Sequence, residues 1–213
     1  MSRKGNSSGR WLNRQKRDRY VRQAQQEGNV SRAHYKLEQL DERFRLVRRQ
    51  DQILELGAAP GGWTRYLGER AAAGRVVAVD PLPVVGGANV TVITGWFGEP
   101  EVDAEIEALA PAGSVDLVLS DMAPNLSGIR SADQARSIHL ADLALQAARH
   151  WLKPGGRLVV KLFQGEGTDG WVREARTVFA SVKVAKPDAS RAESREVYAV
   201  CIGRIAEIAG GGV

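Results

Sequence analysis

The chain has 213 residues, and its 43% hydrophobic content is ordinary for one globular domain with a sizeable core. Its single cysteine, Cys201, lies in the apolar run VYAVCIG, so an internal disulfide is excluded and a reducing cytoplasm is expected. No apolar run approaches the roughly 18 residues of a membrane helix. The polar, arginine-rich N-terminus lacks the apolar segment of a secretory signal. We therefore expect no membrane association.

The net charge of +5 is distributed unevenly along the chain. Residues 1–49 contain 14 Lys and Arg against five acids, a net +9, so residues 50–213 sum to −4. A polyanion such as RNA is a natural partner for such a segment, although a solvated basic tail would have the same composition. We interpret residues 1–30 as a flexible basic arm, partly helical from Leu12 to Gln26, that orders on binding.

A helix is predicted after this arm, with Ser31 as its N-cap and apolar residues on one face up to Phe44. From residue 51, short apolar runs alternate with helical segments. The predicted strands are 52–56, 75–80, 90–94, 115–121, 157–163, 182–186 and 196–203. Helices are predicted over 63–73, 99–110, 131–152 and 167–180.

This alternation predicts an α/β fold with a doubly wound, mostly parallel seven-stranded sheet covered by helices on both faces. The loop between the last two strands is too short for a crossover helix. The last strand should therefore pair antiparallel with the strand before it. We expect one domain over residues 31–205 and a frayed tail over residues 206–213.

A run of small residues, Gly57-Ala58-Ala59-Pro60-Gly61-Gly62, follows the first predicted strand. Such residues let a ligand approach the backbone. The spacing matches neither G-x-G-x-x-G nor G-x-x-x-x-G-K-[ST], which favours a nucleoside without a polyphosphate. Asp80 ends the next strand, where it could accept two ribose hydroxyl groups, although a strand-end Asp is often only a turn cap.

Four stretches together resemble the FtsJ/RrmJ family of ribosomal RNA 2′-O-ribose methyltransferases: ELGAAPGGW, SDMAPNLSG, LKPGGRLVVKLFQGEG and KPDASRAESREVY. The resemblance runs from about Ser31 to Arg204. It implies a Rossmann-like class I methyltransferase fold and S-adenosylmethionine as cofactor. It also implies transfer of a methyl group to the 2′-hydroxyl of a uridine in large-subunit (23S) ribosomal RNA, within the large ribosomal subunit. We expect a monomer.

The family's Lys–Asp–Lys–Glu set corresponds by motif to Lys36, Asp121, Lys161 and Glu196. A ribose hydroxyl is a poor nucleophile at neutral pH, so its proton must be removed as the new bond forms. The resemblance implies Lys161 as the general base, since burial in an apolar strand favours a neutral amine. Asp121 would position Lys161, and Lys36 and Glu196 would orient the hydroxyl.

For the cofactor, the resemblance implies that Gly57 belongs to the binding loop and that Gly61 and Trp63 lie at the methionine end. Asp80 would bind the adenosine ribose, and Asp121 would lie beside both parts.

The chain departs from the family at TGWFGEP, where relatives commonly have Gly-Asp-Phe. Trp96 replaces a carboxylate that can accept a hydrogen bond from the adenine amino group. An indole could stack on the adenine face instead, and Glu99 is a nearby candidate for the lost acceptor.

Three alternatives remain on the sequence. The substrate could be transfer RNA, or the protein could be a catalytically idle RNA-binding assembly factor, which only Trp96 favours. A nicotinamide-dependent reductase would need G-x-G-x-x-G. The histidines, His34, His139 and His150, lack metal-ligand spacing, so we expect no metal. The aromatics Trp11, Tyr20 and Tyr35 lie among arginines, a mixture that suits stacking on unpaired bases as well as ordinary packing.

Overall fold

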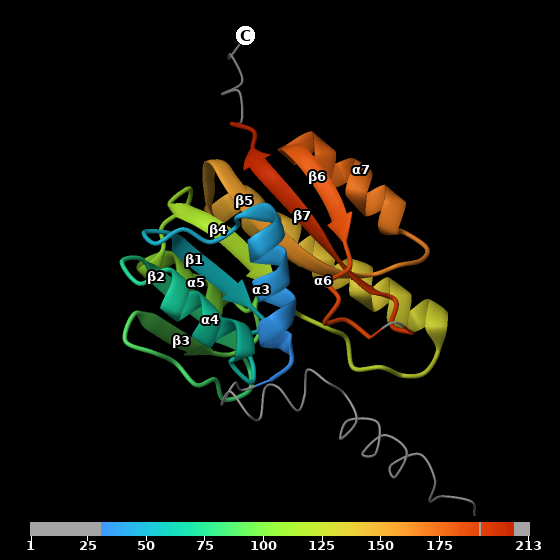
Figure 1. The fold of residues 1–213 in the computed structure, drawn as a ribbon, viewed down its shortest axis with the longest axis horizontal. Coiled ribbons are helices and arrows are strands. Elements are labelled where there is room, and N and C mark those ends of the chain that lie inside the picture. Colours follow the sequence, from blue (N-terminus) through green and yellow to red (C-terminus); the bar gives the residue numbers. More distant parts are fainter. Residues whose placement is uncertain (1–30, 192, 207–213) are drawn as a thin grey trace, which may run out of the picture.

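The computed structural model describes residues 31–191 and 193–206 (Figure 1). The expectations for the basic arm, its helix, Trp11 and Tyr20, and those for residues 207–213, lie outside the described residues. The described strands are β1 (Gln52–Leu56), β2 (Arg75–Asp80), β3 (Val90–Thr94), β4 (Val115–Ser120), β5 (Leu152–Phe163), β6 (Phe179–Ala185) and β7 (Glu196–Arg204). The helices are α3 (Ala33–Phe44), α4 (Gly62–Arg70), α5 (Pro100–Leu109), α6 (Arg130–Trp151) and α7 (Thr168–Val178).

The strands form one sheet in the order β3-β2-β1-β4-β5-β7-β6. Strands β1 to β5 pair in parallel, whereas β7 lies between β5 and β6 and is antiparallel to both. The predicted doubly wound sheet with an antiparallel last strand is confirmed. The chain moves outward in opposite directions from β1 and β4, so a crevice is expected beyond their carboxyl ends.

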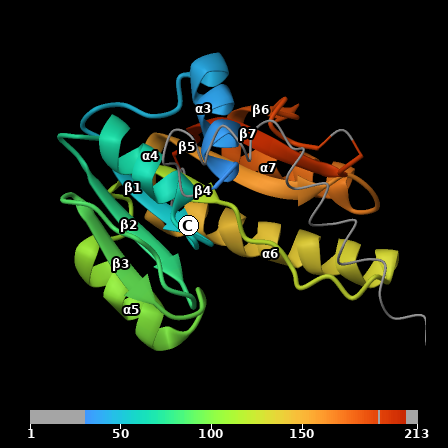
Figure 2. The same cartoon turned by 60° about the horizontal axis from the view of Figure 1, so that its bottom comes forward.

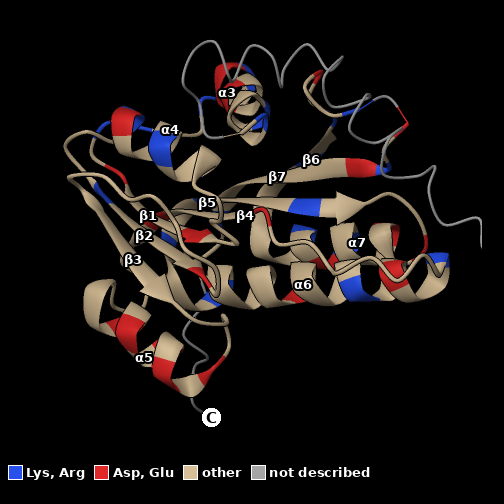
Figure 3. Ribbon diagram, turned by 90° about the horizontal axis from the view of Figure 1, so that it is seen from below, with Lys and Arg blue, Asp and Glu red and all other residues tan. Residues whose placement is uncertain are grey.

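Helices cover both faces of the sheet. Figure 3 shows α3 and α4 on one face and α5, α6 and α7 on the other, and Figure 2 shows α6 running beneath the sheet. Each face has its own apolar core: Leu37, Leu67 and Tyr198 belong to the first, and Leu56 and Trp171 to the second. Strand β4 is buried along its whole length, and four of its six residues are apolar, as expected for a central parallel strand covered on both faces.

Most element boundaries agree with the sequence, and the exceptions have local causes. Strand β5 begins at Leu152 rather than at residue 157, because Leu152 already pairs with Val115 of β4. The Pro-Gly-Gly segment that follows shifts the register, and pairing resumes at Arg157. Helix α3 begins at Ala33, and Arg32 occupies the cap position. Ser31 lies just before it, and its Oγ accepts a hydrogen bond from the Ala33 amide at 3.2 Å.

No helix within residues 31–191 and 193–206 has the length and apolar character needed to cross a bilayer.

Candidate active site

A cleft of about 470 Å³ lies at the carboxyl ends of the parallel strands. Its walls come from the segments that follow β1, β2, β3 and β4, together with the end of β5 and one side of α6. The lining residues include Gly57, Ala59, Asp80, Leu82, Trp96, Phe97, Asp121, Met122, Asn125, Leu140, Leu143 and Lys161. The structure thus places Gly57, Asp80, Asp121 and Lys161 in one cleft.

The glycine loop after β1 is held close to its neighbours. The Gly57 and Ala58 amides donate to the carbonyl of Val79 at 3.0 and 3.2 Å. Gly57 has φ +76°, and a Cβ at this position would lie 2.7 Å from the Met122 amide nitrogen. Only glycine fits both the left-handed backbone and the close approach, so this wall of the cleft is bare main chain.

Asp80 ties the loops after β1 and β2 together. Its Oδ2 accepts a hydrogen bond from the Ala59 amide at 2.9 Å, and its Oδ1 accepts one from the Leu82 amide at 2.8 Å. The turn-cap role and the ligand role are therefore compatible, because each carboxylate oxygen has a second lone pair. Asp80 remains 9% exposed at the cleft wall.

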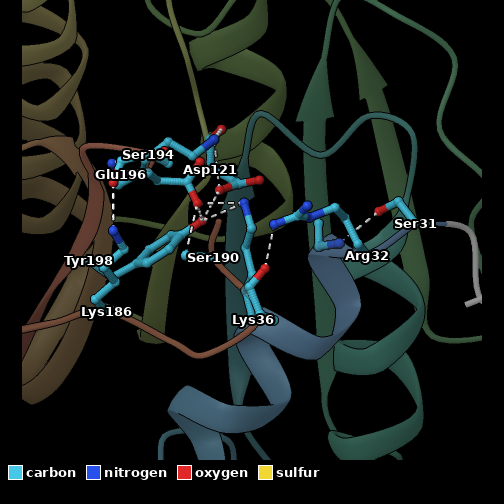
Figure 4. Close-up of polar contacts among 12 residues, drawn as sticks. Ser31, Arg32, Lys36, Asp121, Lys186, Ser190, Ser194, Glu196 and Tyr198 are labelled. Carbon is cyan, nitrogen blue, oxygen red and sulfur yellow. Dashed lines mark hydrogen bonds and ion pairs between the residues drawn. The ribbon is translucent and has the colours of Figure 1, made fainter. Parts of the chain in front are cut away.

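Five polar side chains meet at the inner end of the cleft, and we call them the transfer cluster: Lys36, Asp121, Lys161, Glu196 and Tyr198. They come from α3, the end of β4, β5 and the start of β7. Lys161 Nζ donates to the Asp121 carbonyl at 2.7 Å and lies 2.9 Å from Asp121 Oδ1. Lys36 Nζ lies 2.5 Å from Glu196 Oε1. The structure brings together all four residues of the expected Lys–Asp–Lys–Glu set. Figure 4 shows Lys36, Asp121 and Glu196 around Tyr198.

Tyr198 joins the two ion pairs and was not among the residues expected from the sequence. Its hydroxyl donates to Asp121 Oδ1 at 2.8 Å, and Glu196 Oε1 lies 3.2 Å away as an alternative acceptor. Lys36 Nζ approaches the same hydroxyl at 3.5 Å. A signal was available, because Tyr198 follows Glu196 by two residues in a strand and so shares its face.

Burial and charge set the protonation states of two members of the cluster. Burial raises the pKa of Glu196, but the nearby side chains of Lys36 and Lys161 outweigh it and leave this pKa below its usual value. Burial, followed by the carboxylates of Asp121 and Glu196, raises the pKa of Tyr198 well above its usual value. At neutral pH, Glu196 is therefore a carboxylate and Tyr198 a hydrogen-bond donor.

Gly61 and Trp63, which the resemblance places at the methionine end of the cofactor, are not among the residues that line this cleft. The Trp63 side chain is buried, and its indole N–H donates to the Ala33 carbonyl at 2.8 Å. Its ring packs against Tyr198 with centroids 5.7 Å apart. Trp63 therefore fastens α4 to α3 and supports the transfer cluster from behind. Gly61 has φ +106° and forms the turn that starts α4.

A second hollow, of about 350 Å³, reaches the transfer cluster and is lined by Arg32, Lys36, Arg191, Glu193, Ser194 and Glu196. Lys36 and Glu196 line this hollow, whereas Asp121 and Lys161 line the cleft. Tyr198 links the two pairs, so the cluster lies between two separate spaces. Three of the six lining side chains are cationic and two are carboxylates, and because Lys36 is paired with Glu196, Arg32 and Arg191 give this hollow its basic character.

Within the described residues, no group of three or more His, Cys, Asp or Glu side chains could hold a metal ion. His34 packs edge-on against Tyr35 and Tyr66, and His150 lies 2.9 Å from Glu107.

Glu55 in β1 is a buried carboxyl group that the sequence did not reveal. It lies two residues before Gly57 and has no exposed surface. Burial raises the pKa of Glu55 to about 8; the neighbouring Thr64 opposes the rise, and the carboxylates of Asp121 and Asp80 add to it. At pH 7 the folded protein therefore keeps Glu55 mostly protonated beneath the glycine loop.

Comparison with known proteins places this site in a family. The family model for FtsJ-like methyltransferases matches residues 29–204. A protein of Marinobacter nauticus named "Ribosomal RNA large subunit methyltransferase E" is 48% identical over 198 residues, covering 92% of this chain and 96% of the relative. A protein of Azoarcus with the same name is 49% identical over 193 residues, covering 90% and 94% of the two chains.

Solved structures show the same fold. A putative ribosomal RNA methyltransferase from Plasmodium falciparum superposes with a TM-score of 0.74 at 26% identity, covering 83% of this chain and 98% of its own. A fibrillarin from Methanococcus jannaschii reaches a TM-score of 0.53 at 18% identity over 75% of this chain and 69% of its own, which is a likeness of fold alone.

Proposed function

The chain belongs to the FtsJ-like methyltransferase family, and we propose that it transfers a methyl group from S-adenosylmethionine to the ribose 2′-hydroxyl of a uridine in large-subunit ribosomal RNA. The observation that carries this proposal is the transfer cluster, which contacts the cleft through Asp121 and Lys161 and the basic hollow through Lys36 and Glu196. Two substrates can thus meet at one group of proton-transferring side chains. The names of the two bacterial relatives support the choice of RNA.

The cleft fits the proposed cofactor in size and chemistry. Its volume of about 470 Å³ lies within the range of roughly 300–1,000 Å³ for small-molecule sites. The close approach of Met122 leaves no room for a side chain at position 57, so the cofactor can lie against the backbone there. Asp80 offers oxygens for two ribose hydroxyl groups. When bound, S-adenosylmethionine would supply an electrophilic methyl group on a sulfonium centre.

The transfer cluster would supply proton removal and alignment. We assign Lys161, acting as a neutral amine, as the acceptor of the hydroxyl proton, so that it becomes an ammonium as the methyl group is transferred; Asp121 fixes its Nζ through both a carbonyl and a carboxylate oxygen. Tyr198 donates to the same carboxylate and so helps to fix its orientation. Glu196 and Lys36, held as an ion pair, would orient the ribose hydroxyl at the opening of the basic hollow.

RNA would reach the cluster through the basic hollow. Arg32 and Arg191 stand at its wall beside Lys36 and could bind backbone phosphates. Residues 1–49, which include α3, carry a net charge of +9, the same sign as these arginines. We propose that the protein acts as a monomer in the cytoplasm, on ribosomal RNA within the large subunit.

A labelling experiment tests the substrate and the base together. Purified protein is incubated with methyl-labelled S-adenosylmethionine and with large ribosomal subunits from cells that lack this protein. Transfer RNA is added as the competing substrate. We expect label at one alkali-resistant linkage of ribosomal RNA, and none with Lys161→Ala. Label confined to transfer RNA would keep the chemistry and reject the target. Cofactor binding without any label would reject the enzyme proposal in favour of an RNA-binding factor.

A further inference from the structure

Two large apolar side chains stand exposed at the same edge of the sheet. In the pairing of β2 with β3, Asp80 is opposite Thr94. Leu82 and Trp96 each follow these paired residues by two positions, and both line the cleft. Their exposed fractions are 62% and 63%. Paired exposure of large apolar groups beside a ribose-binding carboxylate indicates a place for a flat apolar ligand group.

The turn that carries Trp96 is fixed by its backbone. The Gly95 amide donates to the Asp80 carbonyl at 3.2 Å, and the Glu99 amide donates to the Trp96 carbonyl at 3.1 Å. A Cβ on Gly95 would lie 2.4 Å from Val102 Cγ2, so the turn also packs tightly on α5. The indole therefore projects from a rigid base, which lowers the entropy cost of holding it against a ligand.

The carboxylates near this turn already have partners. Glu99 Oε2 accepts the Trp96 amide at 3.3 Å, and Glu99 lies outside the cleft lining, so it does not replace a family carboxylate there. The carboxylates within the lining are Asp80, which holds two amides, and Asp121, which holds Lys161. Asn125 is the amide side chain in the cleft lining. Because it can rotate to present either its donor or its acceptor, it does not select between a 6-amino and a 6-oxo group.

We propose that the purine of the cofactor is held by its faces, with Trp96 as one face, and that the cleft consequently discriminates little between a 6-amino and a 6-oxo purine. The proposal rests on S-adenosylmethionine as the cofactor. Stacking depends on the ring face, which adenine and hypoxanthine share, whereas selection between them needs a fixed donor or acceptor at the ring edge. A carboxylate at position 96 would be such an acceptor.

The test is calorimetric titration of the purified full chain with S-adenosylhomocysteine and S-inosylhomocysteine. We expect the two dissociation constants of the wild-type protein to agree within about threefold. Trp96→Ala should weaken both by about 5-fold to 150-fold, which is the loss of roughly 1–3 kcal/mol of base–aromatic stacking. Trp96→Asp should weaken the inosyl compound several-fold to about tenfold more than the adenosyl compound, because one hydrogen bond to the amino group is restored.

Two further variants serve as controls. Trp96→Phe keeps an aromatic face and should keep the wild-type ratio, and Val184→Ala removes an exposed apolar side chain from β6, away from the cleft lining. Discrimination above tenfold by the wild-type protein would overturn this inference while leaving the cofactor proposal intact. Unchanged affinity in Trp96→Ala would overturn it equally. No binding of S-adenosylhomocysteine to the wild-type protein would overturn the cofactor proposal and this inference together.

Discussion

The two ends of the active site are built from different materials. The cofactor end is bare main chain, made by the loop after β1 and tied down by Asp80. The transfer end consists of five buried or half-buried polar side chains from α3, the end of β4, β5 and β7, joined by ion pairs and one tyrosine hydroxyl. One end provides shape and the other provides charge, so substitutions at the two ends should have separable effects on cofactor binding and on rate.

The two ends also differ in what they cost the fold. A glycine loop costs conformational entropy, whereas buried ion pairs require desolvation that their attraction repays only with good geometry. Within the transfer cluster, each carboxylate lies close to a lysine and to Tyr198, so both carboxylates have partners. Removal of one charged partner is therefore expected to destabilise the protein more than replacement of both partners by apolar groups of similar shape.

The largest effect is expected at the transfer end, from Lys161→Met. Methionine keeps much of the length and apolar stem of lysine but cannot accept a proton. We expect kcat to fall by roughly 10²–10⁴, the usual contribution of a general base, with cofactor affinity within a few-fold of wild type. Single-turnover methylation and calorimetric titration measure the two quantities.

Lys183→Met is the matched control, because Lys183 is exposed on β6 and outside the lining of both hollows. Rates that fall equally in the two variants would contradict the role given to Lys161. A variant with normal rate would remove Lys161 from the chemistry altogether.

Gly57→Ala should produce the opposite pattern at the cofactor end. Its φ of +76° and the 2.7 Å approach to the Met122 amide would force the loop away from β4. We expect cofactor affinity to fall by about tenfold or more. Gly113→Ala separates backbone strain from the clash, since Gly113 has φ +70° with open space around it. Equal losses of affinity in both variants would reduce the effect to general destabilisation.

The same contrast explains what the sequence could predict. The glycine loop and Asp80 follow two adjacent strands, so a short motif and the end of the next strand were enough to predict that they lie together. The transfer cluster joins residues as far apart as Lys36 and Tyr198, and a single sequence contains no pairing information over such distances. Resemblance to a family supplied four members and missed the tyrosine.

What the sequence could not show has physical causes of the same kind. The buried contacts of Trp63 with Ala33 and Tyr198 depend on how α4 packs against α3, which no local motif encodes. The start of β5 was missed because a Pro-Gly-Gly segment normally interrupts strands, whereas here the ladder resumes after a register shift. The complete burial of Glu55 likewise depends on the packing around β1 and has no local signature in the sequence.

A smaller effect on rate is expected from Tyr198→Phe, because Tyr198 connects the two ion pairs of the transfer cluster but does not itself accept the proton. The change removes one donor from Asp121 and Glu196 but leaves both lysine pairs in place. We expect kcat to fall about tenfold with unchanged cofactor affinity. Tyr66→Phe loses a similar buried hydrogen bond, to Asp41 at 2.8 Å, away from the site. Both variants should lose about 1–3 kcal/mol of stability, but only Tyr198→Phe should lose rate.

The smallest effect on catalysis is expected from Glu55→Gln, because Glu55 lies outside both hollows yet is influenced by Asp121 and Asp80, one from each end. Its pKa is about 8 in the folded protein, above the ordinary 4.5 of an unfolded glutamate. Between these values the unfolded chain releases a proton that the folded chain retains, so stability falls as pH rises and levels off above pH 8.

Thermal unfolding of the wild-type and Glu55→Gln proteins from pH 5 to pH 8.5 measures this dependence. Because glutamine stays neutral, the free energy of unfolding of the variant should rise relative to that of the wild type as pH rises. The total change is a few kcal/mol, or several degrees in Tm. A difference that is constant across this range would show that Glu55 is ionised at pH 7. The carboxylates of the cofactor end and the transfer end would then have to tolerate a third negative charge between them.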